Sequence, residues 1–99
     1  MGTGLALMEE YRFDDGVPLD TYFYTYRIPS YADLPNVEVI LVEDPEPTGP
    51  YGAKGVGEPP ITPTAPAIAN AVADALGVRI RSLPLTRERV RAAIASRGD

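Results

Sequence analysis

Residues 51–60, Tyr-Gly-Ala-Lys-Gly-Val-Gly-Glu-Pro-Pro, constrain the fold more than any other stretch of the chain. Glycine lets the backbone adopt positive φ and approach a ligand closely, whereas proline fixes φ and removes an amide hydrogen. Three glycines in six residues, followed by two adjacent prolines, favour neither a helix nor a strand. We therefore predict a loop here.

Lys54 and Glu58 are the charged residues of this loop. A residue before proline favours extended geometry, so we expect the backbone of Glu58 to have few accessible conformations. Its carboxylate would then be held on a rigid backbone. Such a carboxylate suits a general acid or base. A second interpretation is a connector whose charges are merely solvated. Spacing alone leaves both open, because short glycine motifs often occur by chance.

The composition excludes several kinds of site. There is no histidine and no cysteine, which removes Ser-His triads, thiolate metal sites, cysteine nucleophiles and disulfides. Any acid–base chemistry must therefore use a carboxylate. The net charge is −5, whereas binding to nucleic acid or to an anionic membrane requires a positively charged surface, so the composition does not favour either partner. Without a long apolar run or a secretion signal, we expect a cytoplasmic protein.

The length allows one small domain. A chain of 99 residues buries only about two-thirds of the surface that it exposes when unfolded, and 11 prolines and 9 glycines make this one loop-rich. We therefore expect a partial domain, a piece of something larger.

The first half of the chain is predicted to be mainly β-structure. Residues 2–7 resemble the tail of a helix or a tight entry turn, and Asp14-Asp15-Gly16 predicts a hairpin whose second arm Pro18 weakens. The apolar, β-branched run 37–43 predicts a strand buried on both faces.

Two clusters in this half have alternative interpretations. Tyr22, Tyr24 and Tyr26 share one face of a predicted strand, where they pack in a sheet or stack on a planar substrate. The carboxylates around residues 43–46 suit a hard cation or simple solvation, and their spacing does not match a calcium loop.

The second half is predicted to be mainly helical. Thr62 or Thr64 is expected to cap a helix that ends at Gly77, with Ile68, Val72 and Leu76 on its apolar face. A short strand at 78–83 should follow. Thr86 should then cap a last helix, in which Val90 and Ile94 face inward and which stops near Gly98. The order of a hairpin, a buried strand, a glycine-rich loop and then helix–strand–helix indicates an α+β fold.

Several runs together resemble one family. The loop 52–60 is followed by Thr-Ala-Pro-Ala-Ile-Ala-Asn-Ala at 64–71, and further matching runs lie at 5–10, 26–29, 39–44 and 82–86. In this order and spacing they resemble the C-terminal end of the molybdopterin-binding large subunit of the xanthine dehydrogenase and aldehyde oxidase family. The resemblance covers essentially all of residues 1–99, and Lys-Gly-x-Gly-Glu-Pro-Pro is its most specific motif.

The resemblance implies roles for the loop. Glu58 would be the general base that activates a molybdenum-bound hydroxide, so that an aldehyde or N-heterocycle is hydroxylated. Lys54, Gly55, Val56 and Gly57 would pass near the molybdopterin cofactor. Iron–sulfur centres and FAD would lie on other subunits or domains, because this chain has no ligands for them.

The resemblance also implies partners. These are the remaining polypeptide of the molybdenum subunit, iron–sulfur and flavin subunits, and a small-molecule substrate. Family subunits are many times longer, and Met1 stands where they commonly have Gln. We therefore expect a terminal fragment that is inactive alone. Two alternatives are a non-catalytic remnant that docks to a partner subunit, and a free-standing anion-binding domain around Lys54 and the helix start near Thr64.

Overall fold

A computed structural model describes residues 1–98 of the chain. It contains three helices, α1 (Gly2–Leu7), α2 (Thr64–Leu76) and α3 (Arg87–Ala95), and one antiparallel hairpin of β1 (Phe13–Asp14) and β2 (Val17–Pro18). Short 3-10 turns occur at Tyr31–Asp33, Pro50–Gly52, Pro59–Ile61 and Ser96–Gly98. The α+β prediction is confirmed.

The hairpin forms where Asp-Gly predicts it. Asp15 and Gly16 both have positive φ, 44° and 79°, which matches the twist of a tight hairpin turn. Phe13 pairs with Pro18 and Asp14 with Val17. One further bond joins the two arms beyond these strands, since the amide of Leu19 donates to the carbonyl of Arg12 over 2.9 Å.

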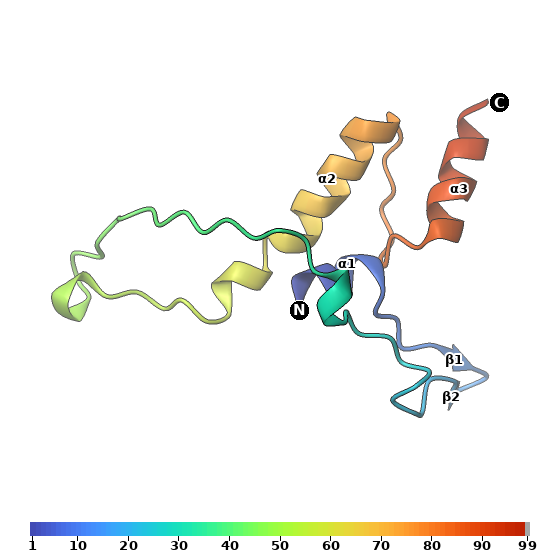
Figure 1. Ribbon diagram of the computed structural model, residues 1–99, viewed down its shortest axis with the longest axis horizontal. Coiled ribbons are helices and arrows are strands. Elements are labelled where there is room, and N and C mark those ends of the chain that lie inside the picture. The colour runs from blue at the N-terminus through green and yellow to red at the C-terminus, as the bar shows by residue number, and fades with distance from the viewer. Residues whose placement is uncertain (99) are drawn as a thin grey trace.

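The buried centre of the fold is small and lies at α1. Ala6 and Leu85 are the buried hydrophobic residues of the described chain, and the amide of Leu85 donates to the carbonyl of Ala6 over 2.7 Å. Helix α1 also packs against the start of α2 (Figure 1), so closely that a Cβ on Gly2 would lie 2.5 Å from the Thr64 side chain.

Helix α2 confirms the predicted apolar face, since Ile68, Val72 and Leu76 are half-buried. It ends as predicted at Gly77, which has the left-handed φ of 66°. The predicted threonine cap is wrong: Pro63 is the N-cap, and the Thr64 hydroxyl donates instead to the carbonyl of Pro60. Thr62 already has helical geometry, with φ −57° and ψ −47°, whereas a capping threonine normally has extended geometry.

Helix α3 is capped by Thr86, as predicted, through a hydrogen bond from the Arg89 amide of 3.2 Å. Val90 is half-buried, whereas Ile94 is 46% exposed and does not face a core. Arg89 pairs with Glu10 and so ties α3 to the segment that follows α1.

Residues 36–60 form a long arm that projects away from the helices (Figure 1). The predicted strand at 37–43 lies in this arm without secondary structure and exposed, so its prediction as a buried strand is wrong for this chain. A strand requires a neighbour to hydrogen-bond with, and the described hairpin has only two-residue strands.

Two further strand predictions are wrong. Residues 78–83 run irregularly between α2 and α3, and residues 22–26 form a turn in which the amide of Tyr26 donates to the carbonyl of Tyr22. The three tyrosines therefore do not share the face of a strand. In both segments a propensity for β-structure finds no partner strand in the described chain.

Candidate functional site

The glycine loop begins at the tip of the arm, in a closed turn. The Glu46 amide donates to the Gly52 carbonyl over 3.1 Å, and Tyr51 and Gly52 have positive φ, 55° and 77°. A Cβ on Gly52 would lie 2.8 Å from Cβ of Pro45. Glycine is therefore required at position 52 for both its φ and its close contact.

Lys54 forms an ion pair across this turn. Its Nζ lies 2.9 Å from Oδ2 of Asp44, on the other side of the arm, and both side chains are solvent-exposed. The cation predicted to lie near a cofactor is thus paired with a carboxylate of its own chain. An exposed pair of this kind contributes little stability, about 0–1 kcal/mol.

Residues 54–58 present a free backbone. None of their amide groups donates a hydrogen bond in the described chain. A Cβ added at Gly55 or Gly57 would meet no atom within 4 Å, so a ligand can approach this backbone closely. Gly52 has positive φ, whereas Gly55 and Gly57 do not, so at these two positions glycine matters for the open space around the backbone.

Glu58 lies where the loop enters the 3-10 turn Pro59–Ile61. Its φ and ψ are −76° and −36°, so the prediction of extended geometry is wrong. Glu58 is the N-cap of this turn, and its carbonyl accepts the amide hydrogen of Ile61 over 3.1 Å. The exposed carboxylate has no hydrogen bond or ion pair within residues 1–98.

Two neighbouring carboxylates, those of Asp44 and Glu46, have hydrogen-bond or ion-pair partners within the chain. Asp44 pairs with Lys54, and Glu46 accepts hydrogen bonds from the hydroxyl and amide of Thr48, which lower the pKa of Glu46. Among the residues that the structure describes, no group of three carboxylates is placed to hold a metal ion.

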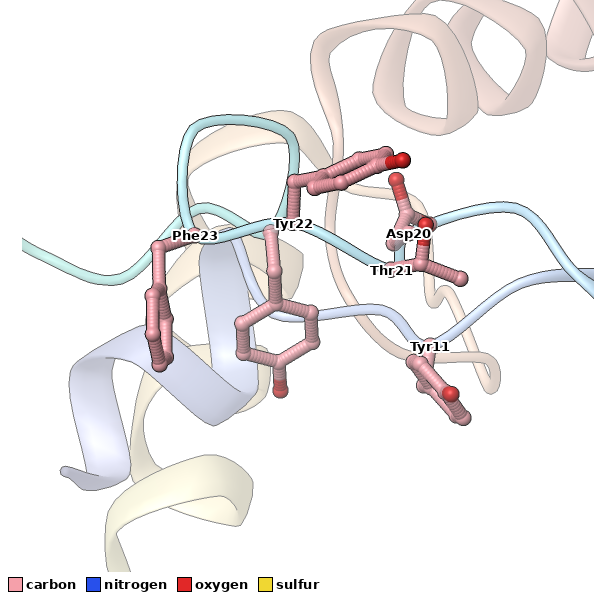
Figure 2. A pocket seen from close by; sticks show the side chains of 6 residues that line it. Tyr11, Asp20, Thr21, Tyr22 and Phe23 are labelled. Carbon is pink, nitrogen blue, oxygen red and sulfur yellow. The ribbon is translucent and has the colours of Figure 1, made fainter.

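A hollow lies beside the hairpin, and its lining includes Tyr22 and Tyr26, for which stacking on a planar substrate was one of the two interpretations of the sequence. It has a volume of about 550 Å³, and Figure 2 shows Phe23 and Tyr11 on opposite sides of it. Its lining residues are Tyr11, Asp20, Thr21, Tyr22, Phe23 and Tyr26.

Two polar contacts fix this lining. Asp20 is buried and accepts two hydrogen bonds from the guanidinium of Arg12, of 2.9 and 2.8 Å, which lower its pKa. The hydroxyl of Tyr26 donates to Glu9 over 3.1 Å, which raises the pKa of Tyr26. The tyrosine-rich run was a sequence signal for the hollow, whereas nothing in the pattern marks Asp20.

The chain is similar to known proteins over most of its length. No family model matches the chain. A xanthine dehydrogenase molybdenum-binding subunit of Escherichia coli O157:H7 is 48% identical over 92 residues, which cover 91% of this chain and 12% of that protein. The aldehyde oxidoreductase molybdenum-binding subunit PaoC of Escherichia coli strain K12 is 43% identical over 93 residues, 91% of this chain and 13% of PaoC.

The chain matches a segment of the xanthine dehydrogenase and aldehyde oxidoreductase molybdenum-binding subunits. An aldehyde oxidoreductase of Megalodesulfovibrio gigas is also similar, with 40% identity over 90% of this chain and 10% of that protein. The resemblance identified from the motifs is thus confirmed. The chain spans only 10–13% of the length of these relatives.

Within this family segment, the structure places the predicted site residues on one continuous backbone run. Lys54, Gly55, Val56 and Gly57 lead directly to Glu58, and Val56 is 80% exposed. No helix of the described chain is both long and apolar enough to span a membrane. Residues 54–58 offer hydrogen-bond donors, room for a ligand and one carboxylate.

Proposed function

We propose that this chain forms part of a molybdenum hydroxylase in which Glu58 is the general base. The main support is the unpartnered Glu58 carboxylate, which directly follows a run of free amide groups in a chain whose relatives are molybdenum-binding subunits. A base must be free to accept a proton, and Glu58 is the carboxylate of this loop without a partner.

The loop fits the molybdenum cofactor by the chemistry of its donors. The amides of residues 54–57 would donate to acceptor atoms of the pterin, and the absence of side chains at Gly55 and Gly57 allows close approach. When bound, the cofactor supplies the redox centre that takes up electrons from the substrate. Iron–sulfur and flavin groups on other subunits or domains would carry those electrons away.

Glu58 would accept a proton at its carboxylate as an aldehyde or N-heterocycle is hydroxylated. The 3-10 turn after Glu58 restricts its backbone and so helps to orient the carboxylate. In the free chain the carboxylate faces solvent, and a closed site formed with the remaining subunit would exclude water from it. The chain alone is therefore expected to be inactive.

The test replaces the matching segment of PaoC with this chain and compares it with a Glu58→Gln variant. Removal of the base with little change of shape should lower kcat for aldehyde oxidation by about 10²- to 10⁴-fold, with bound molybdenum unchanged. Glu88→Gln, at an exposed position in the first turn of α3, is the control and should leave kcat unchanged. Near-normal turnover of the Glu58→Gln chimera would exclude the proposed base.

The alternative function, a non-catalytic module that docks to a partner subunit, is favoured by one observation. The arm exposes a row of apolar side chains, a feature typical of an interaction surface. A chimera that assembles and binds molybdenum, yet turns over equally with and without Glu58, would support this alternative.

A further inference from the structure

The arm holds the most apolar exposed stretch of the chain. The side chains of residues 37–42, except Glu38, are apolar and 76–86% exposed. A contiguous apolar surface is rarely left in water by a folded protein. Residues 37–42 therefore indicate a surface that is covered by protein outside the described residues.

The backbone of the same residues is unpaired along both edges. No amide or carbonyl of residues 37–43 takes part in a backbone hydrogen bond in the described chain. Buried amide and carbonyl groups need partners, and strands on both sides supply them to an interior strand of a sheet.

The two faces of this segment also agree with an interior position. In an extended strand, Val37, Val39 and Leu41 point to one face, and Ile40 and Val42 point to the other. Apolar side chains on both faces are typical of a strand covered on both sides. An edge strand facing water would alternate apolar and polar residues instead.

We infer that residues 37–42 become an interior β-strand in a sheet supplied by the remaining part of a molybdenum-binding subunit. This inference rests on the proposed place of the chain in such a subunit, but not on the role of Glu58. In the relatives the matched segment is only 10–13% of the polypeptide, so most of each relative lies outside the match and could supply such a sheet. A second copy of the arm fits less well, because a two-stranded ribbon leaves the apolar faces exposed.

Pairing in this sheet would also position the glycine loop. The 37–42 segment and the loop 54–58 are the two sides of one arm, joined by the Lys54–Asp44 ion pair and the closed turn at its tip. Fixing residues 37–42 in a sheet would therefore fix the path of the loop that carries Glu58.

Hydrogen exchange tests this pairing directly. In the free chain the amides of residues 37–42 should exchange without protection, because they donate no hydrogen bonds. In the PaoC chimera the same amides should exchange at least about a hundredfold more slowly. Equal exchange in both proteins would overturn the inference.

Three substitutions make the test specific. Leu41→Asp places an unpaired charge in the proposed interface, and Ile40→Pro removes an amide donor, so each should reduce the yield of assembled, molybdenum-loaded chimera by at least about tenfold. Leu41→Ile keeps an apolar, strand-compatible side chain and should assemble normally. Normal assembly of both disruptive variants would overturn the inference, as would failure of the unaltered chimera to assemble.

The two proposals fail in different measurements. Loss of assembly in the Leu41→Asp and Ile40→Pro chimeras supports the interior strand whatever the role of Glu58. A Glu58→Gln chimera that assembles fully but keeps its turnover excludes the base and leaves the strand supported.

Discussion

Asp20 is a buried carboxylate whose chemistry is altered by its surroundings. Its side chain is buried, with 6% of the residue exposed. Its carboxylate accepts hydrogen bonds from the guanidinium of Arg12, which affect its pKa most, and from the Arg12 amide. These bonds favour the ionised form, so the pKa of Asp20 lies below its ordinary 3.8 despite burial, which acts in the opposite direction.

The lowered pKa predicts the pH dependence of this contact. Because ionisation is favoured in the folded chain, the stabilising contribution is complete above pH 3.8 and is lost as the pH falls through the lowered pKa. A carbon-13 NMR titration of the Asp20 carboxyl should give a midpoint below 3.8. Arg12→Gln should move this midpoint upward, and a midpoint that does not respond would show that Arg12 is not its cause.

Residue patterns predict single roles only where the cause is local. Thr86 was predicted as a cap from its place before a helical run, whereas the role of Glu58, suggested by the glycines and prolines that adjoin it, stays a prediction. Asp20 was missed because its partner, Arg12, lies across the hairpin turn and belongs to no recognisable spacing. The geometry of Glu58 was also mispredicted, since the preference of a residue before proline for extended geometry is a tendency, and Glu58 has the helical angles −76° and −36°.

Among the elements, α3 depends most clearly on one cap. The Thr86 hydroxyl accepts the Arg89 amide hydrogen, and the helix has only nine residues, which is marginal without support. Thr86→Ala should destabilise α3 by about 1 kcal/mol.

The measurement for this prediction is the carbon-13 secondary chemical shift of residues 87–90. The shifts should move toward random-coil values in Thr86→Ala and stay nearly unchanged in Thr86→Ser, which keeps a hydroxyl. Identical shifts in all three proteins would mean that the ion pair between Arg89 and Glu10, rather than the cap, stabilises the start of the helix.

Helices and strands differ in how far a single chain specifies them. Helix α2 satisfies its own backbone hydrogen bonds, so its apolar period and Gly77 were enough to predict it. The hairpin likewise needs only its local turn. Residues 37–43 have a strong strand pattern, but a strand needs neighbours that the pattern cannot supply, and the same holds for residues 78–83.

The whole molecule is expanded for its size. Its radius of gyration is 17.7 Å, with extents of 53, 37 and 28 Å. A compact domain of about 100 residues has a radius of gyration near 13 Å. The projecting arm and the small centre around Ala6 and Leu85 account for the difference.

This shape predicts how the free chain unfolds. Cooperative unfolding depends on a shared apolar core, and two buried hydrophobic residues provide very little of one. Calorimetry of the free chain should therefore show no sharp heat-absorption peak, and small-angle scattering should give a radius of gyration well above the compact value.

In the PaoC chimera the same residues should unfold together with the rest of the subunit, because the covered arm adds its apolar surface to a common core. The Leu41→Asp chimera would lose this coupling, since the charge prevents burial of the arm. A sharp transition in the free chain, together with a compact radius, would mean instead that the arm folds back on α1 and α2. In that case residues 37–42 would not be available to a partner sheet, and the exposed path of the glycine loop to Glu58 would change with them.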